Sequence, residues 1–163
     1  MIILLKNKHT LQVGDFYFKC SVGKHGISKN KTEGDKKTPA GIYKIGPLYY
    51  RKNRVKNLET KLKCIKINQK MVWSNDARYF RNYNKLIYTP TIVSHEKLYR
   101  KDYKYDLLIP IKYNYSKSIL GKGSCIFIHL TKNFQPTAGC IALDKKDFLI
   151  MLRIINKNTK IKI

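Results

Sequence analysis

The 163 residues fit one domain, and a hydrophobic share of 43% with 12% aromatic residues is enough for a single core. This composition excludes wholesale disorder, and no apolar run approaches the roughly 18 residues of a transmembrane helix. The formal net charge is +24, but the lysines are spread along the whole chain and accompany many Ile, Asn and Tyr residues. These residues share A/T-rich codons, so genome bias and a functional basic surface are both open explanations of the excess. No signature of a nucleic-acid-binding fold is present, and we expect no specific nucleic-acid partner.

The start of the chain bears on its compartment. The apolar run Ile2–Leu5 is too short for a signal-peptide core, and no small-residue cleavage site follows it. We therefore expect a cytoplasmic protein with no membrane span, or a cell-envelope or periplasmic one if a leader was removed.

Short strand-like runs dominate the first two thirds of the chain. Ile2–Leu5 and Thr10–Val13 predict a hairpin, and the polar, glycine-punctuated stretch Gly26–Pro39 predicts a long loop. The segment 76–103 has no clear period. Other runs of strand length and composition are Phe16–Val22, Gly41–Ile45, Lys63–Ile67, Met71–Trp73, Tyr105–Ile111, Ser124–Leu130, Ile141–Leu143 and Ile161–Ile163.

One segment predicts a helix. Asp144 is a suitable N-cap, Asp147 follows three residues later, and Phe148–Ile155 is almost wholly apolar. Such continuous apolar character predicts a helix packed firmly on a sheet. The whole chain, residues 1–163, is thus expected to be one mainly β domain with a single main helix.

The segment Gly121–Leu143 carries the clearest chemical signal. An apolar strand delivers His129, a polar loop follows, and Cys140 leads into the next apolar strand. Adjacent strand ends can bring an imidazole within reach of a thiol. Gly139 allows a tight turn, so that amides near Cys140 converge as an oxyanion hole.

The other three cysteines are interpreted differently. A lone Cys in an apolar stretch is more commonly a buried structural residue. We expect that of Cys20, Cys64 and Cys125, whereas the glycine and polar loop before Cys140 favour a reactive thiol. None of the four forms a C-x-x-C pair, so we expect no zinc site.

These residues resemble a known active-site motif. His129, the loop and Thr137–Ile141 are similar to the histidine, loop and Ser/Thr-x-Gly-Cys of L,D-transpeptidase (YkuD-type) catalytic domains, and Glu33–Tyr43 resembles that family's glycine-aspartate and threonine-proline-x-glycine block. The resemblance extends from about Val22 to Leu152 and implies a YkuD-like β-sandwich with one main packed helix. Further local matches are Trp73 and Asp76, Tyr83-Asn84, His95-Glu96 and Gly123-Ser124.

Three departures from the family pattern stand out. Ala138 replaces a common histidine, which leaves His129 as the base, and Ala142 replaces a common Arg or Asn. Leu130 replaces a common Ser or Thr after the histidine, so a main-chain carbonyl is expected to orient the imidazole.

The resemblance implies an acyl transfer without metal or organic cofactor. Cys140 attacks a peptidoglycan stem peptide or muropeptide, with Gly139 near the oxyanion, and D-alanine leaves as a thioester forms. An amine acceptor gives transpeptidation, and water gives carboxypeptidation. There are two alternatives. The first is a cytosolic L,D-carboxypeptidase that trims recycled muropeptides, and the second is a non-catalytic module that binds peptidoglycan or another polyanion.

The resemblance also suggests substrate contacts. Glu96 is a candidate for binding a substrate amine or orienting a ring, with an exposed surface pair as the equal alternative for His95 and Glu96. Trp73 is a candidate for stacking on sugar, although a single Trp is more commonly core. Tyr83 and Asn84 are equally candidates for anchoring a loop or contacting substrate. Thr137 belongs to the motif, and weaker lid candidates are Tyr103, Tyr105 and Tyr113.

Overall fold

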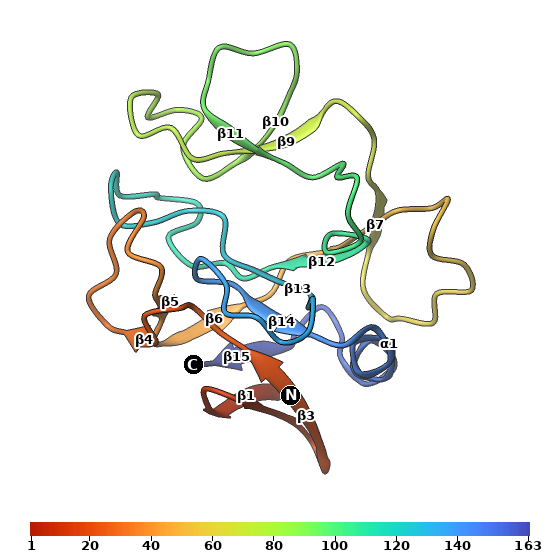
Figure 1. Ribbon diagram of the computed structural model, residues 1–163. Helices are drawn as coiled ribbons and strands as arrows, with labels where there is room; N and C mark the ends of the chain where they lie inside the picture. The colour runs from red at the N-terminus through yellow and green to blue at the C-terminus, as the bar shows by residue number, and fades with distance from the viewer.

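The computed structural model describes all residues, 1–163, and is mainly β with one α-helix. A small three-stranded sheet lies at one end of the molecule, far from β1 and β3 (Figure 1). It consists of β10 (Leu86–Tyr88), β9 (Met71–Ser74) and β11 (His95–Lys97). The large curled sheet has ten strands in the order β6 (Ile42–Lys44), β15 (Lys160–Lys162), β1 (Ile2–Asn7), β2 (Thr10–Val13), β3 (Phe16–Ser21), β14 (Ile141–Leu143), β13 (Phe127–Leu130), β12 (Leu107–Pro110), β7 (Leu48–Tyr50) and β8 (Cys64–Lys66).

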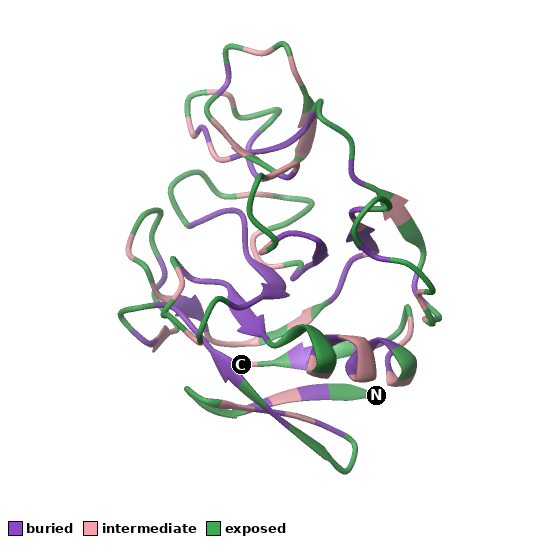
Figure 2. Cartoon of the chain, turned by 45° about the vertical axis from the view of Figure 1, so that its right-hand side comes forward, coloured by how far each residue is buried: buried purple, intermediate pink, exposed green.

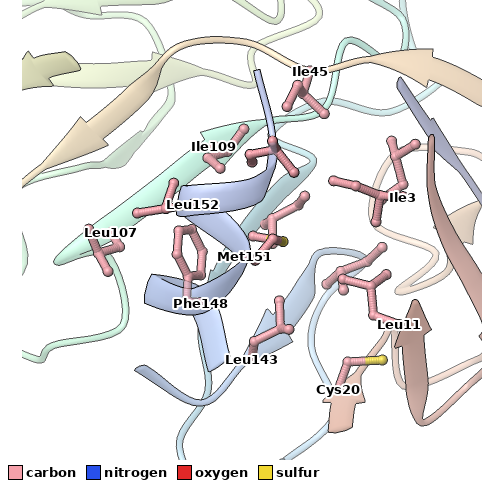
Figure 3. Packing of buried hydrophobic residues seen from close by; sticks show 14 of the residues in the cluster. Ile3, Leu11, Cys20, Ile45, Leu107, Ile109, Leu143, Phe148, Met151 and Leu152 are labelled. Atoms are coloured by element: carbon pink, nitrogen blue, oxygen red, sulfur yellow. The ribbon is translucent and has the colours of Figure 1, made fainter. Parts of the chain in front are cut away.

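The helix α1 (Lys145–Ile154) confirms the expected element. The Asp144 side chain caps it by accepting a hydrogen bond from the Lys146 amide at 2.9 Å, which satisfies one of the free amides of the first turn. Its buried residues Phe148, Met151 and Leu152 follow the spacing of one helix face. Figure 3 shows this face packed on the apolar side chains of the sheet, including Leu107, Ile109 and Leu143.

The central strands are buried on both faces, and Figure 2 shows buried residues concentrated there. On one face, Ile128 and Ile141 join the core beneath α1. On the other face, Phe127 and Cys140 join a second apolar cluster, which also contains Trp73 of the small sheet. Because side chains alternate along a strand, this second face is where the functional residues of β13 and β14 lie.

Several strand predictions are confirmed, usually with fewer residues than expected. The hairpin Ile2–Leu5 and Thr10–Val13 forms with Ile3 opposite Val13 and Leu5 opposite Leu11. The expected loop Gly26–Pro39 contains a two-stranded parallel pair, β4 (Ile27–Ser28) and β5 (Thr38–Pro39). Strands β7, β10 and β11 were not predicted, since β10 and β11 lie in the segment without a clear period and β7 in Pro47–Arg51.

Two cysteine-related expectations need correction. The strand predicted at Ser124–Leu130 begins only at Phe127, because Gly123 and Cys125 have φ of +102° and +54°, outside the strand region. Cys125 is buried as expected, but in an irregular segment. Cys64, expected in the core, is exposed on the edge strand β8. No helix has the length and apolar character needed to cross a membrane.

Candidate active site

Cys140 and His129 lie on the same face of neighbouring strands. β13 and β14 run parallel, with Ile128 opposite Ile141 and His129 opposite Ala142. The same register brings Cys140 beside Phe127, whose amide donates a hydrogen bond to the Cys140 Sγ at 3.4 Å. Cys140 and His129 are each 7% exposed, and both line one cavity of about 390 Å³. The expected sharing of a cleft by thiol and imidazole is therefore present.

The His129 imidazole is oriented by the main chain. Its Nδ1 lies 2.8 Å from the Leu130 carbonyl oxygen, and a carbonyl can only accept a hydrogen bond. Nδ1 therefore carries the proton, and Nε2 is the free base. The Tyr105 ring packs edge-on against the imidazole with centroids 5.2 Å apart. The expectation that a main-chain carbonyl replaces the usual Ser or Thr is confirmed.

Burial keeps both reacting groups neutral in the free protein. It raises the pKa of the Cys140 thiol to about 12, and the charge of Glu96 acts in the same direction. Burial lowers the pKa of His129 to about 4. The thiol donates a hydrogen bond to the Cys125 carbonyl oxygen at 3.2 Å. With the pKa of the thiol raised and that of the imidazole lowered, both side chains are neutral in the free protein and do not form an ion pair.

The turn before Cys140 is built around Gly139. Its φ is +140°, and a Cβ at this position would lie 2.8 Å from the Lys37 carbonyl oxygen. The Thr137 hydroxyl accepts the Gly139 amide at 3.0 Å and donates to the Cys140 carbonyl at 2.6 Å. Gly139 therefore shapes the turn while its own amide is engaged. The amides of Ala138 and Cys140 have no hydrogen-bond acceptor in the chain.

The family model of the L,D-transpeptidase catalytic domain matches residues 2–163 of the chain. The chain belongs to this family. No curated protein and no solved structure matches it.

Within this L,D-transpeptidase domain, the predicted substrate contacts divide into two groups. Glu96 and Thr137 line the cavity together with Cys140 and His129. His95 does not, and its Nδ1 is 2.6 Å from the Val93 carbonyl oxygen. Trp73, Tyr83 and Asn84 do not line the cavity either, and their side chains are buried.

Asn84 holds together the segments behind the cavity. Its Oδ1 accepts from the Trp73 indole at 3.0 Å and from the Cys125 amide at 3.1 Å. Its Nδ2 donates to the carbonyls of Tyr113 and Asn114 at 3.1 and 2.7 Å. Trp73 and Asn84, both taken from the motif, thus hold the segment that carries Cys125 in the cavity wall. Neither side chain lines the cavity itself.

Tyr83 has a similar anchoring contact. Its hydroxyl donates to Glu33 at 2.6 Å, and the Ser124 hydroxyl donates to the same carboxylate oxygen at 2.8 Å. Glu33 therefore joins the loop before β5 to the segment that leads into β13.

Several cavity residues were not singled out from the sequence for this site. Cys125 was interpreted as core, and Arg100 and Lys104 follow β11 in a stretch without a motif. Lys31 is 3% exposed and pairs with Asp35 at 2.7 Å. Nothing in their sequence spacing marks these residues, because they come from three segments that are far apart in the chain.

Proposed function

We propose that this protein is a cysteine acyltransferase that acts on peptidoglycan stem peptides. The observation that supports this most directly is the cavity shared by the Cys140 thiol and a His129 ring whose Nε2 is left free to accept a proton. Membership in the L,D-transpeptidase family supports the same class of reaction.

The proposed chemistry follows from the protonation states. His129 Nε2 takes the thiol proton as Cys140 Sγ attacks the carbonyl carbon at the L-centre of a diaminopimelate-like residue. The Cys140 amide donates to the developing oxyanion. The C–N bond to D-alanine then breaks, the imidazolium returns the proton to the leaving amine, and a thioester remains. An amine acceptor gives a cross-link, and water gives a trimmed stem.

The charge of the cavity suits this substrate. Lys31, Arg100, Lys104 and Lys132 line it, whereas its carboxylates are Glu33 and Glu96. Stem peptides carry several carboxylates, including that of the terminal D-alanine, and cations in a concave site attract them. The cationic side chain that position 142 lacks is thus supplied by other segments.

The test is incubation with purified tetrapeptide muropeptides followed by mass spectrometry. Loss of alanine reports trimming, and a cross-linked dimer reports transpeptidation. Cys140→Ala should abolish both, and a thioester adduct on the wild-type protein should be absent from this variant. If the wild-type protein gives neither product nor adduct, the acyltransferase proposal is wrong.

A second candidate is a non-catalytic peptidoglycan-binding module. The pKa of about 12 of the buried Cys140 thiol favours it, because a neutral thiol is a poor nucleophile. It predicts that muropeptides bind equally to wild-type protein and Cys140→Ala, with no adduct and no product.

A further inference from the structure

The carboxylate of Glu96 is incompletely neutralised in the cavity. It lies on β11, and the Tyr105 hydroxyl donates to its Oε1. The nearest cation, Arg100, has Nη1 3.9 Å from the same oxygen. The Arg100 guanidinium instead donates three hydrogen bonds to the Asp102 carboxylate, the shortest at 2.6 Å. The negative charge of Glu96 is thus stabilised mainly by a neutral hydrogen-bond donor, the Tyr105 hydroxyl.

This arrangement is unusual in a chain with 34 basic and 10 acidic residues. Three other carboxylates, all more buried than Glu96, each have a cation at 3.2 Å or closer: Asp35 with Lys31, Asp76 with Arg78, and Asp106 with Arg54. The Glu96 side chain is 29% exposed and lines the cavity, and a partly buried charge that has no close partner yet can be reached from a cavity commonly serves a ligand. Burial accordingly raises the pKa of Glu96.

We propose that Glu96 binds the side-chain ammonium of the substrate residue whose carbonyl Cys140 attacks. The substrate class is therefore a stem peptide with a diamino acid at that position and a free side-chain amine. This inference rests on the proposed function and names the group that the site selects. Among the groups around the cavity, cations would repel an ammonium, whereas Glu96 lies beside the reacting thiol.

Binding of the ammonium also acts on the nucleophile. The Glu96 charge raises the pKa of the Cys140 thiol, so neutralising that charge favours loss of the thiol proton. Substrate binding thus favours the Cys140 thiolate that attacks the substrate, whereas the thiol stays protonated in the empty site. A stem whose amine is acylated lacks the positive charge and gains neither effect.

Glu33 is the competing carboxylate at the same cavity. Its Oε2 already accepts from the hydroxyls of Tyr83 and Ser124, which ties it to the wall. Glu96 accepts from the Tyr105 hydroxyl and from the Cys125 thiol, and a thiol is a much weaker donor than the Ser124 hydroxyl that holds Glu33. This difference favours Glu96 as the ammonium site, and the experiment separates the two.

The experiment compares two tetrapeptide muropeptides that differ only in a free or N-acetylated side-chain amine. For the wild-type protein we expect kcat/KM for the free amine to exceed that for the acetylated one at least ~10-fold, as for loss of one partner of a buried charge pair. Glu96→Gln, which keeps an acceptor for Tyr105, should abolish the preference. Glu59→Gln, at an exposed ion pair with Arg153, should retain it.

A second measurement separates this inference from the proposed function. Without substrate, Glu96→Gln should speed iodoacetamide labelling of Cys140, whereas Glu59→Gln should not. If the wild-type protein turns over neither muropeptide, the proposed function fails. Calorimetry then tests the ammonium site separately: the muropeptide with a free amine should bind more tightly to the wild-type protein than to Glu96→Gln. The inference is overturned if Glu96→Gln retains the preference, or if Glu33→Gln loses it while Glu96→Gln does not.

Discussion

Nδ1 of His129 donates a hydrogen bond to the carbonyl oxygen of the next residue, Leu130, at 2.8 Å. Because this contact uses only the main chain, it holds the ring whatever side chain follows the histidine. It also fixes the proton on Nδ1 and leaves Nε2 without a hydrogen-bond partner in the chain. The His129 ring is therefore held in place even though Leu130 replaces the Ser or Thr that is common at this position in the family.

Replacement of His129 tests its role as the base. His129→Gln should lower alanine release from a tetrapeptide muropeptide by roughly 10²- to 10⁴-fold, the usual contribution of a general base. His9→Gln, at an exposed site away from the cavity, is the matched control. Equal rates for the His129 variant and the control would remove His129 from the mechanism.

The buried imidazole predicts a pH dependence of stability. The pKa of His129 is about 4 in the folded protein against an ordinary 6.5, so between these values the unfolded chain binds a proton that the folded chain does not. The free energy of unfolding should therefore fall as pH drops from about 6.5 to 4, by up to roughly 3 kcal/mol from this residue.

Urea unfolding of wild type and His129→Gln across this range measures the effect. The difference between the two isolates the histidine, because Glu96 has a raised pKa and acts with the opposite sign in both proteins. A difference that does not change with pH would show that His129 is not buried as a neutral ring.

Gly139 should tolerate no side chain. Gly139→Ala combines a φ of +140° with a Cβ 2.8 Å from the Lys37 carbonyl oxygen. We expect a loss of about 2–4 kcal/mol by urea unfolding, together with loss of activity as the turn moves. Gly34→Ala has a positive φ but no atom within 4 Å of the added Cβ, and should lose only about 1 kcal/mol. Equal losses would mean that backbone strain alone, without a clash, limits position 139.

Asn84 should be a stability residue rather than a substrate contact. Asn84→Ala removes four hydrogen bonds and leaves the Trp73 indole and the Cys125 amide without an acceptor. We expect a loss of about 3 kcal/mol by thermal or urea unfolding, whereas the exposed Asn158→Ala should change little. A stable Asn84→Ala protein with weakened muropeptide binding would instead restore the substrate-contact interpretation.

Thiol labelling of the free protein should follow exposure. Cys64 is exposed, whereas Cys140 is buried with a pKa of about 12 and Cys20 is buried with a pKa of about 12. Iodoacetamide at neutral pH should therefore modify Cys64 first, as read by peptide mass spectrometry. Faster labelling of Cys140 than of Cys64 without substrate would indicate a preformed thiolate and contradict the neutral resting state.

Local patterns were sufficient for much of the framework. The helix was predicted because its cap at Asp144 and its apolar run are contiguous in sequence, and the first hairpin because its two strands are neighbours. β10 and β11 were missed because they form only by pairing with β9, and their own residues do not alternate. The exposure of Cys64 was missed as well, because it depends on the place of β8 at the edge of the large sheet, which the sequence of β8 does not reveal.

The sequence by itself determined the candidate Cys140–His129 pair, since the two residues are separated by one loop and lie at neighbouring strands. It also determined the need for glycine before the thiol and for a main-chain partner of the imidazole. Tertiary structure alone decided what surrounds the pair: the wall built by Asn84, the ring of Tyr105 and the under-neutralised carboxylate of Glu96. These contacts join segments far apart in the chain, and their strength depends on burial and distance, neither of which local sequence encodes.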